Sequence, residues 1–118
     1  MRTFIVILTV FCLIGVVAAS ETAKEWNDKG RALCERGKYE EAIECFDKAI
    51  EINPDFVCAW HGKGRVLYEQ GKYEEAIKCY DKAIEIDPNL AYVWHGKALA
   101  LDKLGRHEEA HVLIKLRT

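Results

Sequence analysis

Apolar residues recur along this chain at the spacing of an amphipathic α-helix. In the middle of the chain, Trp60, Gly64 and Leu67 stand at positions i, i+4 and i+7, which lie on one face of a helix. Gly71 follows at a point where a glycine can end a helix in the left-handed conformation. A second apolar face comes next and stops before Pro88, because proline cannot continue a helix. The pattern predicts two helices, over residues 57–70 and 73–86.

The same pattern occurs three times in register. Residues 23–56 and 57–90 agree at 21 of 34 positions without a gap, and residues 91–118 keep the register. A fixed period of this length is typical of stacked repeats, in which one helix pair cannot bury its apolar face alone. The predicted helices cover residues 23–36, 39–52, 57–70, 73–86, 91–104 and 107–117. The chain is therefore predicted to be all-α, with three helix-turn-helix repeats.

The first twenty residues differ from the repeats. Arg2 precedes an uncharged stretch from Phe4 to Ala19, and the charged sequence begins at Glu21. A basic start, an apolar stretch and small residues near a cleavage site are typical of a secretory signal peptide. The stretch would span about 24 Å as a helix, against a hydrocarbon core of roughly 30 Å, so an uncleaved anchor stays an alternative. Residues 1–20 are predicted to be a signal peptide or a membrane anchor helix. The protein is then secreted, or anchored as a single-pass membrane protein through residues 4–19.

The repeats resemble those of the tetratricopeptide repeat (TPR) family. The resemblance rests on the period and on the order of large and small residues, which the first repeat meets with Trp26, Gly30, Leu33, Ala42, Phe46, Ala49 and Pro54. It implies a superhelical solenoid with TPR 1 at residues 23–56, TPR 2 at 57–90 and a truncated TPR 3 at 91–118. The third repeat departs at its end, where Arg117 stands at the position of Ala49.

In the TPR family the first helix of each pair lines a concave groove that binds an extended peptide or a helix of a protein partner. The resemblance therefore implies a non-catalytic scaffold or adaptor. Carried over by position, the partner-binding groove consists of Asn27, Arg31, Cys58, His61, Arg65, Tyr68, Tyr92 and His95. The same faces also carry Lys24, Cys34, Glu35, Glu69, Leu99, Asp102 and Lys103. These residues equally fit a solvated surface on which Arg31–Glu35 and Arg65–Glu69 form i,i+4 ion pairs.

Two further expectations concern the groove. Some TPR proteins hold a partner's terminal carboxylate with Lys-x-x-x-Asn on the first helix and Lys-x-x-x-Arg on the first helix of the third pair. Neither pattern occurs here, so binding of a chaperone tail in that way is not expected. His61 and His95 suggest pH-dependent partner binding between pH 5.5 and 7.5, because imidazole changes charge in that range.

One short motif points to different chemistry. His107-Glu108-x-x-His111 has the spacing with which zinc metallopeptidases place two imidazoles and a glutamate on one helix. The segment is, however, the third copy of a stretch that reads KYEEAI in the first two repeats, where no histidine is present. A zinc site needs a third ligand, and no His, Asp or Glu follows His111. We expect a degraded terminal repeat without metal, cofactor or catalysis, and a zinc metallopeptidase is the remote alternative.

Charge and cysteine content narrow the function further. The 17 basic and 19 acidic residues are interspersed, whereas nucleic-acid binding needs a clustered excess of positive charge. The four cysteines beyond residue 20 are predicted to be free thiols, because helix spacing keeps them too far apart for disulfides. The apolar last helix lacks a polar cap, which leaves a second hypothesis open: a self-assembling subunit, or a fragment of a larger TPR protein, that docks through this helix.

Overall fold

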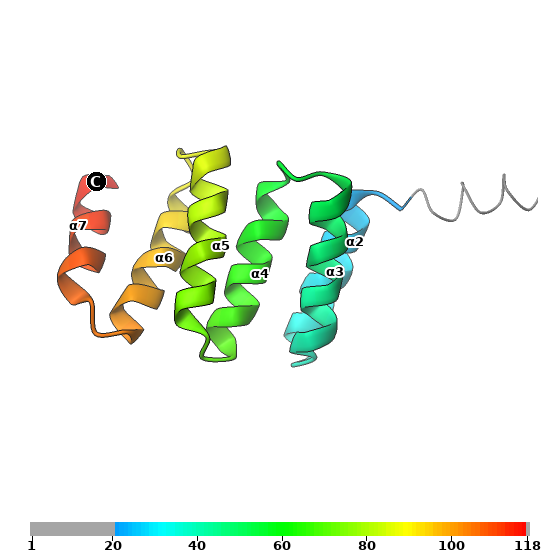
Figure 1. The fold of residues 1–118 in the computed structure, drawn as a ribbon, viewed down its shortest axis with the longest axis horizontal. Helices are drawn as coiled ribbons and strands as arrows, with labels where there is room; N and C mark the ends of the chain where they lie inside the picture. The colour runs from blue at the N-terminus through cyan, green and yellow to red at the C-terminus, as the bar shows by residue number, and fades with distance from the viewer. Residues whose placement is uncertain (1–20, 118) are drawn as a thin grey trace, which may run out of the picture.

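A computed structural model describes residues 21–117 as six helices that follow one another along a line (Figure 1). The helices are α2 (Ala23–Glu35), α3 (Tyr39–Ile52), α4 (Val57–Glu69), α5 (Tyr73–Ile86), α6 (Ala91–Lys103) and α7 (His107–Arg117). Their bounds agree with the predicted ranges to within one residue, and this part of the chain contains no strand. The all-α prediction with three helix pairs is therefore confirmed for residues 21–117.

The signal peptide or anchor predicted over residues 1–20 lies outside the described residues and stays a prediction. Between residues 21 and 117, no helix combines the length and the apolar character needed to cross a membrane.

Each helix pair turns at a glycine in the left-handed conformation. The three glycines are Gly37, Gly71 and Gly105, with φ of 76°, 79° and 80°. In the first turn, the N–H of Lys38 donates to the carbonyl of Leu33 over 2.9 Å, and the N–H of Gly37 donates to the carbonyl of Cys34 over 3.0 Å. These bonds satisfy carbonyls that the end of α2 leaves without an intrahelical donor, which is why glycine stands at this position.

The turn between consecutive repeats is held by a tryptophan of the following helix. The indole N–H of Trp60 donates to the carbonyl of Pro54 over 2.9 Å, and that of Trp94 donates to the carbonyl of Pro88 over 2.8 Å. Proline cannot extend α3 or α5, and its carbonyl stays available to the indole. The tryptophan and proline of the repeat pattern thus fix the connection between repeats.

Aromatic side chains on the second helices join each repeat to the next. The Phe46 ring, 1% exposed, lies between Gly30 of its own repeat and Gly62 of the following one. A Cβ added at Gly62 would lie 2.5 Å from the ring, so only glycine admits this approach. Tyr80 occupies the equivalent place one period later, between two further glycines. The small and large residues of the repeat therefore interlock across both junctions.

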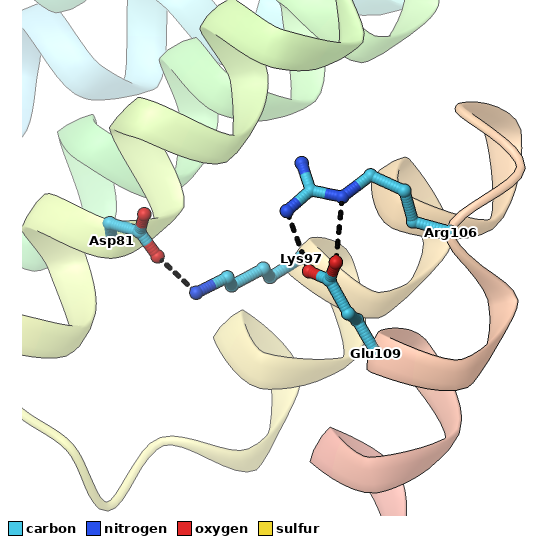
Figure 2. Close-up of polar contacts among 4 residues, drawn as sticks. All are labelled: Asp81, Lys97, Arg106 and Glu109. Carbon is cyan, nitrogen blue, oxygen red and sulfur yellow. Dashed lines mark hydrogen bonds and ion pairs between the residues drawn. The ribbon is translucent and has the colours of Figure 1, made fainter.

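An ion pair crosses each junction beside the aromatic ring. The ammonium of Lys63 lies 2.7 Å from the carboxylate of Asp47, and Lys97 lies 2.6 Å from Asp81 in the same way (Figure 2). Both lysine side chains are largely covered, which reduces the screening of these pairs by solvent. The ion pairs fix the register of each repeat on the previous one.

The helix contacts make the first-helix side of the solenoid the inner side. Within residues 21–117, α2 contacts α4 and α4 contacts α6, whereas α3 and α5 do not contact one another, and neither do α5 and α7. Because the first helices are closer together than the second helices, the row of repeats curves toward α2, α4 and α6. The concave face is therefore the face that carries the predicted groove residues.

Candidate functional site

Six of the eight predicted groove residues line a single pocket on the concave face. The pocket has a volume of about 230 Å³, and the six residues are Asn27, Arg31, Cys58, His61, Arg65 and Tyr92. They come from α2, α4 and α6, so the pocket joins all three repeats. Sites for drug-sized molecules have volumes of about 300–1,000 Å³. This pocket therefore fits one side chain of a larger ligand.

The other two predicted residues lie outside the pocket. Tyr68 packs edge-on against Tyr73, with ring centroids 5.3 Å apart, and contacts the apolar cluster formed by α4, α5 and α6. His95 is exposed on α6 and does not line the pocket. Helical periodicity assigns both residues to the same face as the other predicted groove residues, but it does not show how far each reaches toward α5 or into solvent.

Sequence reasoning missed the floor of the pocket. Phe46 and Gly62 line it, although neither is among the predicted groove residues. The signal for Gly62 was present, because two glycines within one turn of a helix, Gly62 and Gly64, indicate a close approach by another group. Cys34 and Glu35 also line the pocket. The sequence places both on the same helix faces as the eight predicted groove residues, although neither is among the eight.

Asn27 is buried in this pocket without a hydrogen-bond partner. The residue is 5% exposed, and its side-chain carbonyl accepts no bond within the described part of the protein. A buried polar group in this state costs about 1–3 kcal/mol, and most such groups in folded proteins are paired. The pocket therefore contains a hydrogen-bonding group that the rest of the fold does not use.

Arg31 and Arg65 line the pocket from α2 and α4. The Arg31–Glu35 and Arg65–Glu69 ion pairs of the alternative, solvated-surface interpretation do not occur among the ion pairs of residues 21–117. The charged pairs lie instead at the repeat junctions and on other surfaces. Both arginine side chains are exposed, so their guanidinium groups can donate to a ligand.

His61 is enclosed by groups from the neighbouring helices. Its ring lies 4.7 Å from the Tyr92 ring in an edge-on contact and 5.8 Å from the Tyr80 ring, measured between centroids. Burial, together with the positive charges of Arg65 and Arg31, lowers the pKa of His61 to about 4. His61 therefore stays neutral between pH 5.5 and 7.5 in the free protein. The predicted pH dependence of partner binding comes from this residue only if the bound partner raises the pKa of His61.

The same burial makes stability depend on pH. The folded-state pKa of His61 lies below the ordinary value of 6.5, so protonation favours the unfolded chain. The contribution of neutral His61 to stability is complete above pH 6.5 and is lost as the pH falls from 6.5 toward 4.

After allowance for partial solvent access, we expect the wild type to lose about 1–2 kcal/mol more unfolding free energy than His61→Gln between pH 7 and 4.5. Urea unfolding at the two pH values measures this difference. His95→Gln, at the exposed equivalent position, is the matched control, and equal losses in wild type and His61→Gln would contradict the prediction.

Sequence comparisons identify the repeats. Family models described as tetratricopeptide repeat match residues 23–56 and 45–78, and a model described as TPR repeat matches residues 64–105. Together they cover more than half of the chain, without a break between residues 23 and 105. The chain belongs to the tetratricopeptide repeat family. A comparison with curated proteins found no match.

Solved TPR structures show the same arrangement of helices. A MamA crystal structure is 26% identical with a TM-score of 0.76, and the match covers 80% of this chain and 55% of the MamA chain. This chain thus spans about half the length of the MamA chains it matches. The second TPR of Spaghetti (RPAP3), solved bound to the HSP90 peptide SRMEEVD, is 27% identical with a TM-score of 0.76. That match covers 80% of this chain and 88% of the RPAP3 chain.

The third TPR places the zinc-like motif on the surface. Both His107 and His111 are exposed, and Nδ1 of His107 lies 3.0 Å from a carboxylate oxygen of Asp102. Within residues 21–117, no three His, Cys, Asp or Glu side chains are grouped so that they could hold a metal ion. Within residues 21–117 no helix follows α7, whereas α6 partly covers Ile77, the residue equivalent to His111.

The thiols of the TPR region are free in the structure. Cys45 and Cys79 are buried on the second helices, and burial raises the pKa of Cys79 to about 11, which keeps this thiol unreactive. Cys34 and Cys58 line the groove pocket instead. Burial and then the adjacent Cys58 raise the pKa of Tyr92.

Proposed function

We propose that this protein is a non-catalytic interaction module that binds a segment of a partner protein in the groove formed by α2, α4 and α6. TPR repeats support a role in protein interaction, and the RPAP3 domain of similar fold was solved with a peptide bound. The proposed ligand is an extended or helical segment that inserts one side chain into the pocket.

The observation that carries this proposal is the state of Asn27. Its buried carbonyl has no partner within the described protein, and it lines a pocket with two arginines that form no ion pair there. The Asn27 carbonyl makes no hydrogen bond that stabilises the described fold, but it can accept one from a bound ligand. The amide of an incoming peptide group can donate to Asn27, and a carbonyl or carboxylate can accept from Arg31 or Arg65.

The walls of the pocket limit what can enter. Phe46 and Gly62 form an apolar floor, and the rings of His61 and Tyr92 form an aromatic side. Glu35 also lines the pocket, which therefore carries both positive and negative side chains. An acidic ligand group would gain less electrostatic binding energy here than it would beside the arginines alone. The pocket is suited to a medium-sized side chain whose backbone is held at the rim.

Asn27→Ala separates binding from stability. Asn27 makes no internal hydrogen bond, so its removal relieves an unpaired buried carbonyl, and this gain offsets the packing that the smaller side chain loses. The free energy of unfolding should therefore fall by no more than about 0.5 kcal/mol. Affinity should fall about 5- to 10-fold, since the ligand loses a hydrogen bond in a covered site. The ligand is a segment selected from a displayed peptide library on the full chain, and calorimetric titration gives its affinity.

Two controls make this test specific. Arg31→Ala should also weaken binding, whereas Arg36→Ala removes the same charge outside the pocket and should leave the affinity unchanged. The peptide SRMEEVD is a useful second probe. Because the two lysine-containing patterns are absent, we expect it to bind more weakly than the selected segment. Unchanged affinity in both Asn27→Ala and Arg31→Ala would contradict the proposed groove.

Export or membrane anchoring is a separate part of the proposal. It is supported by the apolar sequence of residues 4–19 and would place the groove outside the cytoplasm. N-terminal sequencing of the protein from membrane and soluble fractions distinguishes a cleaved signal peptide from a retained anchor.

A further inference from the structure

Five of the eleven residues of α7 are apolar, and three of these five are exposed. Val112, Ile114 and Leu116 expose 51%, 46% and 78% of their surface. The positions equivalent to Val112 and Leu116 in the first two repeats all carry Lys or Glu, so these apolar residues are specific to the third repeat. Val112 and Leu116 stand four residues apart on one face of the helix, where they form an apolar stripe that another protein surface can cover. The question is which surface covers it.

The stacking that joins the repeats does not suit α7. Where α3 and α5 carry the joining aromatic residue and aspartate, α7 carries Ile114 and Lys115. Where α4 and α6 carry the contacting glycine and lysine, α2 carries Asp28 and Lys29. Stacking α2 of a second copy on α7 would therefore bring Lys29 toward Lys115 and press the Asp28 carboxylate against Ile114. Both contacts are unfavourable, which argues against head-to-tail assembly.

We propose instead that α7 pairs with α7 of a second copy, antiparallel and about a two-fold axis at Val112. In such a pair, residues equally far before and after Val112 lie level with one another. Glu109 of one copy is then level with Lys115 of the other, and Val112 meets its own counterpart. The charges are complementary on both sides of the axis because an antiparallel pair repeats each contact twice.

The surface beside Val112 has a hollow at the position that Leu116 of the second copy reaches. A hollow of about 430 Å³ is lined by Lys97, Leu101, Glu108, Glu109, Val112 and Leu113. Leu116 of the second copy lies level with Glu108 in the proposed pairing, so its side chain can enter this hollow. Leu101 is buried at 2% exposure and Leu113 is half-buried, which gives the entering leucine apolar contacts.

The acidic side of the contact is held in position by a neighbouring arginine. Arg106 donates two hydrogen bonds to Glu109, over 3.1 and 2.6 Å, at the start of α7 (Figure 2). A carboxylate has acceptor sites left after such a pair, so Lys115 of the second copy can donate to it as well. One short helix buries less surface than the roughly 1,200–2,000 Å² of a stable interface, so the dimer is weak. α7 does not line the groove pocket, and the groove stays open in the dimer.

Sedimentation velocity of the full chain in reducing buffer, from about 10 μM to 1 mM, tests the proposal at concentrations suited to a weak dimer. The average mass should rise from 13.5 kDa toward twice that value and then stop rising. Glu109→Lys and Lys115→Glu should each move the transition to at least about tenfold higher concentration, because like charges then face each other. The double variant should restore the wild-type transition. Residues 109 and 115 do not face each other within one helix, so restoration reports a contact between copies.

Control variants distinguish this contact from other causes of association. Leu116→Asp should abolish the dimer, whereas Glu75→Lys, the equivalent of Glu109 one repeat earlier, should leave it unchanged. Circular dichroism confirms that each variant is folded. The proposal is overturned by a monomer at every concentration, by masses that grow beyond the dimer, or by a double variant that stays as weak as the single ones. None of these results bears on partner binding in the groove.

Discussion

Replacing Phe46 with alanine should lower the free energy of unfolding by about 3–5 kcal/mol, the usual cost of removing a buried aromatic ring. The ring is 1% exposed and fills the space between Gly30 and Gly62, where no side chain can move in to replace it. It also forms the pocket floor, so the groove loses its shape as well. Because small domains have stabilities of about 5–15 kcal/mol, this single change removes a large fraction of the total.

The loss should be concentrated in the first repeat. Each repeat contacts only its neighbours, so a cavity at Phe46 loosens α2 and α3 from α4. The contacts of α6 with α5 and with α7 stay in place. Urea unfolding measures the total, and amide hydrogen exchange locates it. Ile52→Ala, on the same helix with the side chain 50% exposed, is the control and should cost less than about 1 kcal/mol. A loss at Phe46 no larger than at Ile52 would contradict the packing of the junction.

Replacing Gly62 with alanine should also destabilise the protein, although alanine is the better helix former. The new Cβ would lie 2.5 Å from the Phe46 ring, which also packs closely against Gly30. Overpacking of this kind typically costs about 1–3 kcal/mol, which outweighs the gain of up to about 1 kcal/mol in helix propensity. Thermal or urea unfolding gives the net change, and an increase in stability would show that the junction is loose.

A second change at the same contact tests its cause. Phe46→Leu makes room beside residue 62, so the variant with both changes should be more stable than the sum of the two single losses predicts, by about 1 kcal/mol. Additive losses would mean that Gly62→Ala acts through something other than the Phe46 ring. The double-variant comparison thus separates a steric clash from a general loosening of α4.

The helices could be predicted closely from the sequence because their signals are local. Gly37, Gly71 and Gly105 end the first helix of each pair, and Pro54 and Pro88 stop the second. Each signal depends on the backbone at that residue alone. Because the sequence repeats every 34 residues, each helix end predicted in one repeat is supported by the same residue in the next. The helix bounds in the structure agree with the predicted bounds to within one residue.

The site was less predictable because burial there depends on neighbouring helices. Asn27 and His95 occupy equivalent positions, yet Asn27 is buried and His95 is exposed. Asn27 has a following repeat that contributes Gly62 and His61 to its pocket, whereas no repeat follows His95 among the described residues. Helical periodicity gives the face of a residue on its own helix, and it carries no information about what the next helix places over it.

The two proposed interactions use separate parts of the solenoid: a partner segment binds in the groove, and a second copy binds at α7. The concave face holds polar groups that the fold leaves unused, and α7 holds apolar groups that the fold leaves uncovered. Binding of a partner at one surface does not block the other, because the two share no lining residue. A dimer through α7 would carry two grooves, and a partner with two binding segments would then gain avidity.

The central claim is that a partner segment binds on the concave face at Asn27. Nuclear magnetic resonance of the isotope-labelled chain, titrated with a library-selected segment, tests it most directly. We predict shifts of the Asn27 side-chain amide signals and of the backbone amides around Arg31, His61 and Tyr92, the residues that line the pocket from α2, α4 and α6. Saturable shifts confined to α3, α5 and α7, with the Asn27 signals unmoved, would contradict the claim.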